Sequence, residues 1–120
     1  MNKAKRSGTA FESQLVRWLN AVFDTDEFTR LPLKGRFDVG DVGWLRRSGR
    51  KVVIEAKNCQ RLELAKWLRE AEEERGNADA LAKAVFVKRR GVGDATFGET
   101  YVVMEARDLY ALVTGEELED

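Results

Sequence analysis

Two carboxylates and one ammonium group are spaced so that they could act together on a phosphodiester bond. Asp41 and Glu55 are 14 positions apart, with a glycine-containing turn midway between them. This spacing predicts a hairpin of strands 41–46 and 51–57 that brings the two carboxylates opposite each other. Lys57 lies two residues after Glu55 and therefore shares its face of the strand. We expect two acids and a lysine to meet at one sheet edge.

Such a cluster favours magnesium chemistry. Mg²⁺ prefers six oxygen ligands and keeps part of its hydration shell, so we expect Asp41, Glu55 and the backbone carbonyl of Ala56 to bind it, with Mn²⁺ able to substitute. Lys57 would position or deprotonate the attacking water, or neutralise developing negative charge. Asp38 is a second candidate acid, ranked below Asp41 because it should point elsewhere. An idle acidic pair would repel, whereas a divalent cation reverses that interaction.

Two more polar residues could join this site. Glu12 lies at the edge of the apolar face of a helix predicted over 10–23, where it could complete the metal shell directly or through water. A capping box with Thr9 explains Glu12 equally well. Gln60, in the first turn of a helix predicted over 60–75, could orient a water or a phosphate. A plain polar helix start is the favoured explanation of Gln60 on position alone.

The elements that must position these residues form one α/β domain over 1–120. Residues 1–8 read as a flexible basic arm and 114–120 as an acidic tail. Helical and strand periodicity predicts helices over 10–23, 60–75 and 107–113, and strands over 28–33, 41–46, 51–57, 84–88 and 101–104. In the second helix, one set of acidic residues is expected to lie on the solvated face: Glu70, Glu72, Glu73 and Glu74.

Composition narrows the possible functions. The chain has no histidine, which excludes histidine nucleases, Ser-His-Asp triads and imidazole zinc sites. A lone Cys59 and the lack of any long apolar run predict a cytoplasmic protein without a membrane span. Residues 1–61 carry 13 basic and 7 acidic side chains, a net +6, and 62–120 carry 8 and 14, a net −6. A basic half is compatible with a polyanionic partner.

These residues resemble the PD-(D/E)xK nuclease superfamily, and within it the small Holliday junction resolvases of archaea and bacteriophages. Matched one by one, Asp41 and Glu55 are similar to the metal ligands, Lys57 to the catalytic lysine, Glu12 to the helix acid and Gln60 to the trailing polar residue. Gly40 departs from the pattern because it stands where the superfamily name has a proline. The resemblance implies a restriction-endonuclease-like core, a central mixed β-sheet flanked by helices in the order α-β-β-β-α-β-β-α.

The same resemblance implies a magnesium-dependent homodimer that resolves four-way DNA junctions by paired nicks. DNA contact is expected from basic residues that give affinity without sequence choice: Lys3, Lys5, Arg6, Lys34, Arg36, Arg89 and Arg90. Trp44, on the site hairpin, is more simply a packing residue than a ligand contact. Two alternatives remain open, namely another nuclease of the superfamily acting on flaps, ends or duplex DNA, and a non-catalytic DNA-binding subunit.

Overall fold

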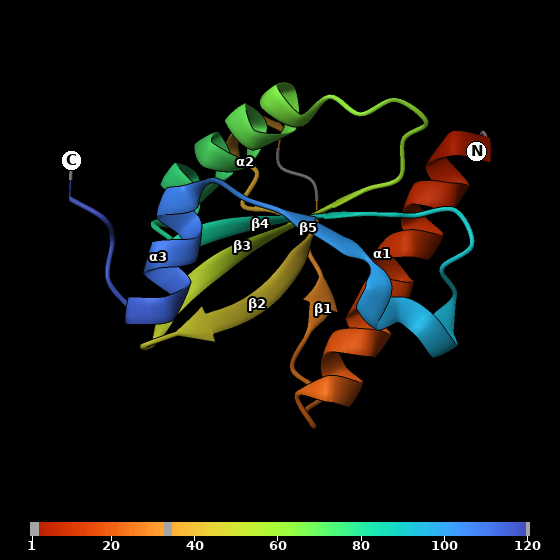
Figure 1. Cartoon of the computed structure of the whole chain (residues 1–120), viewed down its shortest axis with the longest axis horizontal. Helices are drawn as coiled ribbons and strands as arrows, with labels where there is room; N and C mark the ends of the chain where they lie inside the picture. The colour runs from red at the N-terminus through yellow and green to blue at the C-terminus, as the bar shows by residue number, and fades with distance from the viewer. Residues whose placement is uncertain (1–2, 33–34, 120) are drawn as a thin grey trace.

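A five-stranded mixed sheet organises the chain (Figure 1). The computed structural model describes residues 3–32 and 35–119, with side chains from residue 8 onward. The helices are α1 (Lys3–Val22), α2 (Leu64–Ala78) and α3 (Ala106–Thr114), and the short 3₁₀ helices are η1 (Gly35–Phe37) and η2 (Asp94–Glu99). The strands are β1 (Thr29–Arg30), β2 (Val42–Arg47), β3 (Arg50–Lys57), β4 (Ala82–Val87) and β5 (Tyr101–Val103).

The strands lie in the order β1-β2-β3-β4-β5. Only the β3–β4 pair is parallel among these neighbours, because α2 forms the crossover between them. The predicted α/β class, the element order and the antiparallel pairing of the site hairpin are therefore confirmed.

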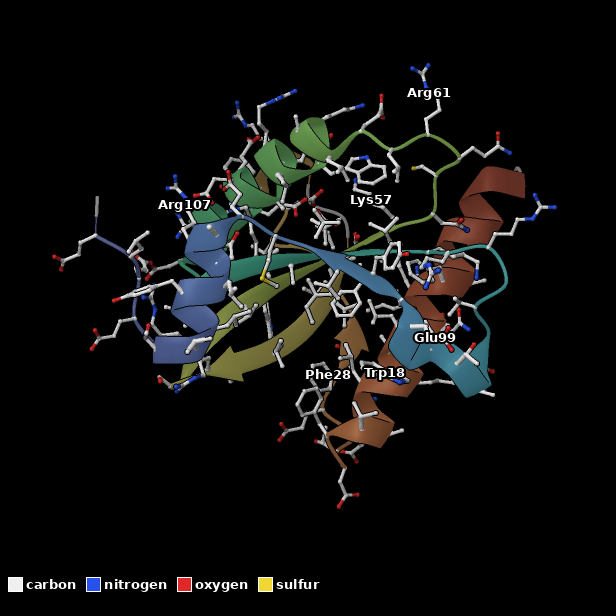
Figure 2. The ribbon with its side chains drawn as sticks, in the orientation of Figure 1. Trp18, Phe28, Lys57, Arg61, Glu99 and Arg107 are labelled. Atoms are coloured by element: carbon white, nitrogen blue, oxygen red, sulfur yellow. The ribbon has the colours of Figure 1, made fainter. Side chains whose placement is uncertain are left out.

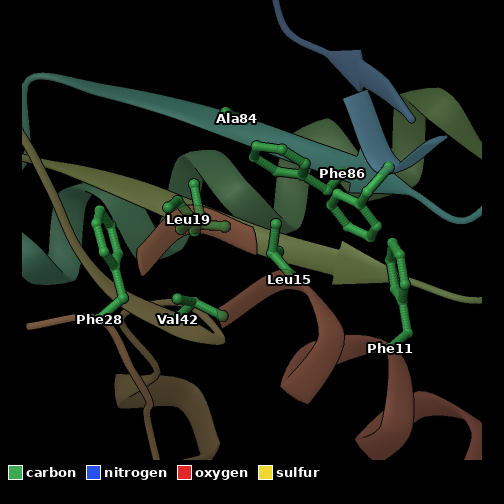
Figure 3. Close-up of a cluster of buried hydrophobic side chains, with 9 residues drawn as sticks. Phe11, Leu15, Leu19, Phe28, Val42, Ala84 and Phe86 are labelled. Carbon is green, nitrogen blue, oxygen red and sulfur yellow. The ribbon is translucent and has the colours of Figure 1, made fainter. Parts of the chain in front are cut away.

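The two faces of the sheet are covered by different helices. Phe11, Leu15 and Leu19 of α1 pack against Ile54 and Phe86 on one face (Figure 3). On the other face, Trp67 and Ala71 of α2 pack against Val85 and Val87 of β4. Side chains alternate along a strand, so β3 turns Ile54 toward α1, and Glu55 and Lys57 toward α2. This alternation decides which helix can reach the candidate site.

Helix α1 begins earlier than its sequence pattern predicted. Residues 3–8, expected as a flexible arm, are helical from Lys3 onward, since lysine, alanine and arginine are good helix formers. Thr9 and Glu12 therefore lie inside the helix, and the predicted capping box is wrong. Lys3, Lys5 and Arg6 are expected to contact DNA, but their side chains lie outside those that the structure describes.

Helix α2 begins later than predicted. Gln60 lies in an exposed loop rather than in a first turn, and Leu64 is the first helical residue. The first buried side chain is Trp67, so the helix forms only where its apolar stripe reaches the sheet. It also continues through Gly76 and ends at Asp79, whose left-handed backbone (φ 50°) caps it.

The remaining differences are small. Strand β1 is only Thr29–Arg30, since Pro32 has no N–H with which to extend the ladder, and β4 starts at Ala82 rather than residue 84. Within the described residues, none of the helices is long and apolar enough to span a membrane.

Candidate functional site

The pairing of the site hairpin shifts register between its turn and Asp41. Near the turn, Arg47 pairs with Arg50 and Leu45 with Val52, a register that would continue to place Asp41 opposite Ala56. A one-residue irregularity between Val42 and Leu45 shifts the pairing, so that Val42 faces Ile54. Asp41 lies just before the paired residues of β2, and its carboxyl is a hydrogen-bonding neighbour of the Glu55 carboxyl. The two acids therefore meet through their side chains.

The backbone and side chain of Asp41 are both anchored at the end of β2. Its N–H donates to the Ile54 carbonyl at 2.8 Å, and its carbonyl accepts from the Leu31 N–H at 2.8 Å. The Asp41 Oδ2 atom accepts a hydrogen bond from the Ala56 N–H at 2.8 Å. Because the N–H and C=O of a strand residue point to the same side, the Ala56 carbonyl also lies on the Asp41 side of β3. Asp41 and the backbone of Ala56, two of the positions expected to bind a metal, thus lie side by side.

Gly40 allows this approach of the two strands. Its φ is 111°, and a Cβ there would lie 3.0 Å from the Ile54 carbonyl oxygen. Proline, whose φ is fixed near −65°, cannot adopt this backbone. The local backbone therefore requires a residue other than the proline that the superfamily name has at this position.

Glu55 is a buried carboxyl group, with 3% of its surface exposed. Its hydrogen-bonding neighbours are the carboxyl groups of Asp41 and Glu74, which offer a donor only when protonated. Burial is the largest cause that raises the pKa of Glu55 far above its usual range, and the two neighbouring carboxyls add to it. The site therefore disfavours an ionised Glu55 in the absence of a cation.

Glu74 is the residue that sequence reasoning missed. It was expected on a solvated helix face, yet it is half-buried beside Glu55, and its Oε2 atom is buried with no hydrogen-bond partner in the described structure. Burial raises the pKa of Glu74, the hydrogen bond with Glu55 and the charge of Lys57 lower it, and the charges of Asp41 and Asp38 raise it, so that the net shift is upward. A signal existed, because Glu74 lies seven residues after the buried Trp67 and therefore on the same helix face.

Lys57 lies at the end of β3, beneath α2 (Figure 2). Its Nζ donates to Glu70 Oε2 at 3.4 Å, so Glu70 also belongs to the inward side of α2. Burial lowers the pKa of Lys57, but the charges of Glu55, Glu70 and Asp41 outweigh it, and the net shift is upward. Lys57 is therefore an ammonium ion at neutral pH in the metal-free protein, which suits charge neutralisation better than proton abstraction.

Glu12 comes from the opposite face of the sheet. Its Oε1 accepts from Arg30 Nε at 3.2 Å. Burial raises its pKa, and the charge of Asp41 contributes, whereas Arg30 lowers it. Glu12 is thus close enough to feel Asp41, but its direct partner is Arg30, and the acid beside Glu55 is Glu74.

The other candidates lie around the site rather than in it. Gln60 is exposed in the loop before α2, and Arg61 of that loop extends away from the body (Figure 2). Asp38 is half-buried and lines a small cavity of about 160 Å³ with Glu70, Glu74 and Asn77. The Lys51 ammonium lies over the Trp44 ring, 4.5 Å from its centroid, so Trp44 contacts a neighbouring side chain as a packing residue does.

Among the expected DNA contacts, Arg36 and Arg90 are exposed. Arg89 stacks 4.0 Å from the Tyr101 ring centroid and donates to the Glu99 carbonyl at 2.7 Å. It therefore holds the segment before β5 in addition to any role toward DNA. Lys34 lies outside the described residues.

The donor set suits an ion that keeps water. Across residues 3–32 and 35–119, no group of three or more acidic or cysteine side chains is arranged to hold a metal ion by itself. Asp41, Glu55 and the Ala56 carbonyl could still supply part of an octahedral shell, with water at the other positions, as is usual for Mg²⁺. A divalent cation would also offset the crowding of three carboxyls.

Comparison of this chain with protein-family models, curated proteins and solved structures finds no significant match.

Proposed function

We propose that this chain is a magnesium-dependent endonuclease that hydrolyses phosphodiester bonds in branched DNA, with four-way junctions as the preferred substrate. One observation carries the proposal: the buried Glu55 carboxyl has the Asp41 carboxyl as a hydrogen-bonding neighbour, with Lys57 on the same face of β3. A buried acidic pair beside a lysine is costly to folding and is explained by a cation and a phosphate that neutralise it.

The position of each residue in the site determines the role that we propose for it. Asp41, Glu55 and the Ala56 carbonyl would hold Mg²⁺, which supplies Lewis acidity and lowers the pKa of bound water. Lys57 faces the same space as an ammonium ion and would stabilise negative charge on the nonbridging oxygens of the phosphate. The Ala56 N–H keeps Asp41 Oδ2 in place, so the carboxylate needs little reorganisation during the reaction.

Substrate choice rests on the resemblance to junction resolvases and on exposed cations. Arg36 and Arg90 are free to reach phosphates, and such contacts read backbone shape rather than base sequence. Two symmetric cuts in a junction require two sites, so we propose a homodimer as the active species.

The test is cleavage of labelled four-way junction, flap and linear duplex DNA, each with and without Mg²⁺. We expect junction cleavage that needs the metal, and loss of at least about 100-fold in rate for Asp41→Asn and Glu55→Gln. Glu73→Gln, which removes the same charge from an exposed position, is the matched control. Undiminished cleavage by the purified Glu55→Gln protein would overturn the site assignment. Faster cleavage of flap or duplex DNA than of the junction would show that the proposed substrate is wrong.

A further inference from the structure

The third acid of the site comes from α2, because that helix covers the face of β3 that carries Glu55. Glu70, Ala71 and Glu74 lie three, four and seven residues after Trp67, which are the positions of one helix face. Trp67 and Ala71 pack on the sheet, Glu70 binds Lys57 at 3.4 Å, and Glu74 reaches Glu55. One face of α2 thus holds both an apolar anchor and the acids of the site.

Two observations set Glu74 apart from a chance acidic neighbour. Glu55, the side chain it faces, is 97% buried, and its hydrogen-bonding neighbours among the described residues are the carboxyl groups of Asp41 and Glu74. In addition, Glu74 Oε2 is buried without a hydrogen-bond partner in the described part of the chain. A buried carboxylate oxygen without a donor is unfavourable, and a water bound to a cation is a donor that would satisfy it.

Glu12, the acid that the resemblance assigns to this role, is engaged elsewhere. Its carboxylate is paired with Arg30 at 3.2 Å, and α1 lies on the other face of the sheet. Beside burial, the groups that raise the pKa of Glu55 are the carboxyls of Asp41 and Glu74.

From these contacts we infer that Glu74 is a positioning residue of the metal site, and that it accepts a hydrogen bond from a water of the Mg²⁺ shell held by Asp41 and Glu55. The inference rests on the proposed metal site but does not require that the protein cut DNA. An outer carboxylate of this kind orients the bound water and raises the affinity for the ion.

The test measures Mn²⁺ binding to the DNA-free protein by isothermal titration calorimetry, together with the melting temperature in EDTA. For Glu74→Gln we expect a Kd about 10-fold weaker than that of the wild type. We also expect an unchanged or higher melting temperature in EDTA, because the substitution removes carboxyl repulsion. A purely structural role would instead lower the melting temperature and leave the Kd unchanged.

Three matched variants complete the design. Glu73→Gln removes an exposed charge one residue away, and Glu12→Gln removes the α1 acid; both should bind Mn²⁺ like the wild type. Glu74→Asp keeps the charge on a shorter side chain and should give an intermediate Kd. Wild-type affinity in Glu74→Gln, an equal loss in Glu73→Gln, or no binding by the wild type would overturn the inference.

The same experiment separates the two proposals. Mn²⁺ binding that depends on Glu74, in a protein that cuts none of the three DNA substrates, supports the inference and refutes the proposed function. Junction cleavage with a Glu74→Gln protein of wild-type Mn²⁺ affinity supports the function and refutes the inference.

Discussion

At the scale of single residues, the site holds carboxyl groups so close together that their negative charges would repel one another. Asp41, Glu55 and Glu74 crowd three carboxyls together, and the folded protein resists ionising Glu55 because burial and both neighbours disfavour the charge. The cost of this arrangement to folding should therefore depend on pH and on divalent ions.

We predict that the metal-free protein loses stability as pH rises. The pKa of Glu55 is raised on folding, so its contribution is fully present below the unfolded pKa, near 4.5, and is lost as pH climbs toward the raised value. The slope for one such proton is at most about 1.4 kcal/mol per pH unit. Urea unfolding in EDTA between pH 5 and pH 8 should show a steeper decline for the wild type than for Glu55→Gln. Parallel curves would contradict this prediction.

The acidic pair could be predicted from the sequence because it is a local contact within one hairpin. Two strands and a short turn determine which residues face each other, so spacing alone indicated Asp41 and Glu55. Glu74 could not be assigned with the same ease, since its role depends on how α2 crosses the sheet. The position of Glu74 on the Trp67 face was visible in the sequence, but a run of glutamates is usually solvated.

At the scale of elements, a second buried cation joins three pieces of the fold. Lys83 of β4 has no exposed surface, and its Nζ donates to Glu72 of α2 at 2.9 Å, and to Glu105 and Asp108 at 2.7 and 2.9 Å. Asp108 also accepts from the Lys83 N–H at 3.2 Å. The sequence predicted that this strand begins at residue 84, one position after Lys83. A lysine is rarely buried in a strand unless it is fully paired.

Replacing Lys83 should be strongly destabilising. Lys83→Met leaves the buried Asp108 without its cation, and removal of one partner from a buried ion pair costs about 3–5 kcal/mol. Lys66→Met is the matched control: its Nζ lies 4.0 Å from Glu63 at an exposed site, where a pair is worth about 1 kcal/mol or less. Urea denaturation of both variants measures the difference, and equal losses would contradict it.

At the scale of the whole molecule, the charge asymmetry of the sequence does not persist in space. The basic first half and acidic second half are joined by ion pairs that cross between them: Arg17 with Asp94, Arg50 with Glu117, and Lys57 with Glu70. Folding therefore places some basic side chains of residues 1–61 beside acidic side chains of residues 62–120. The proposed binding of DNA would therefore depend on individual exposed cations rather than on a basic half.

Junction affinity should accordingly show only a moderate salt dependence. Each phosphate contact contributes about −0.9 to the slope of log K against log salt on duplex DNA, so Arg90→Ala should reduce the magnitude of the slope by about 1. Arg69→Ala, an exposed arginine on α2, is the charge-matched control. Fluorescence anisotropy with labelled junction in EDTA, at several salt concentrations, measures binding without cleavage. An unchanged slope for Arg90→Ala would remove this residue from the DNA contacts.

The irregularity between Val42 and Leu45 bears on how the site could be recognised in other chains. It absorbs one residue, so the thirteen positions between Asp41 and Glu55 reflect the path of β2 as much as the needs of the chemistry. A regular hairpin with one residue fewer in β2 would bring the same carboxylates together across a shorter interval. A search pattern with a fixed interval would then separate proteins whose sites are alike, whereas one that counts paired strand positions would group them.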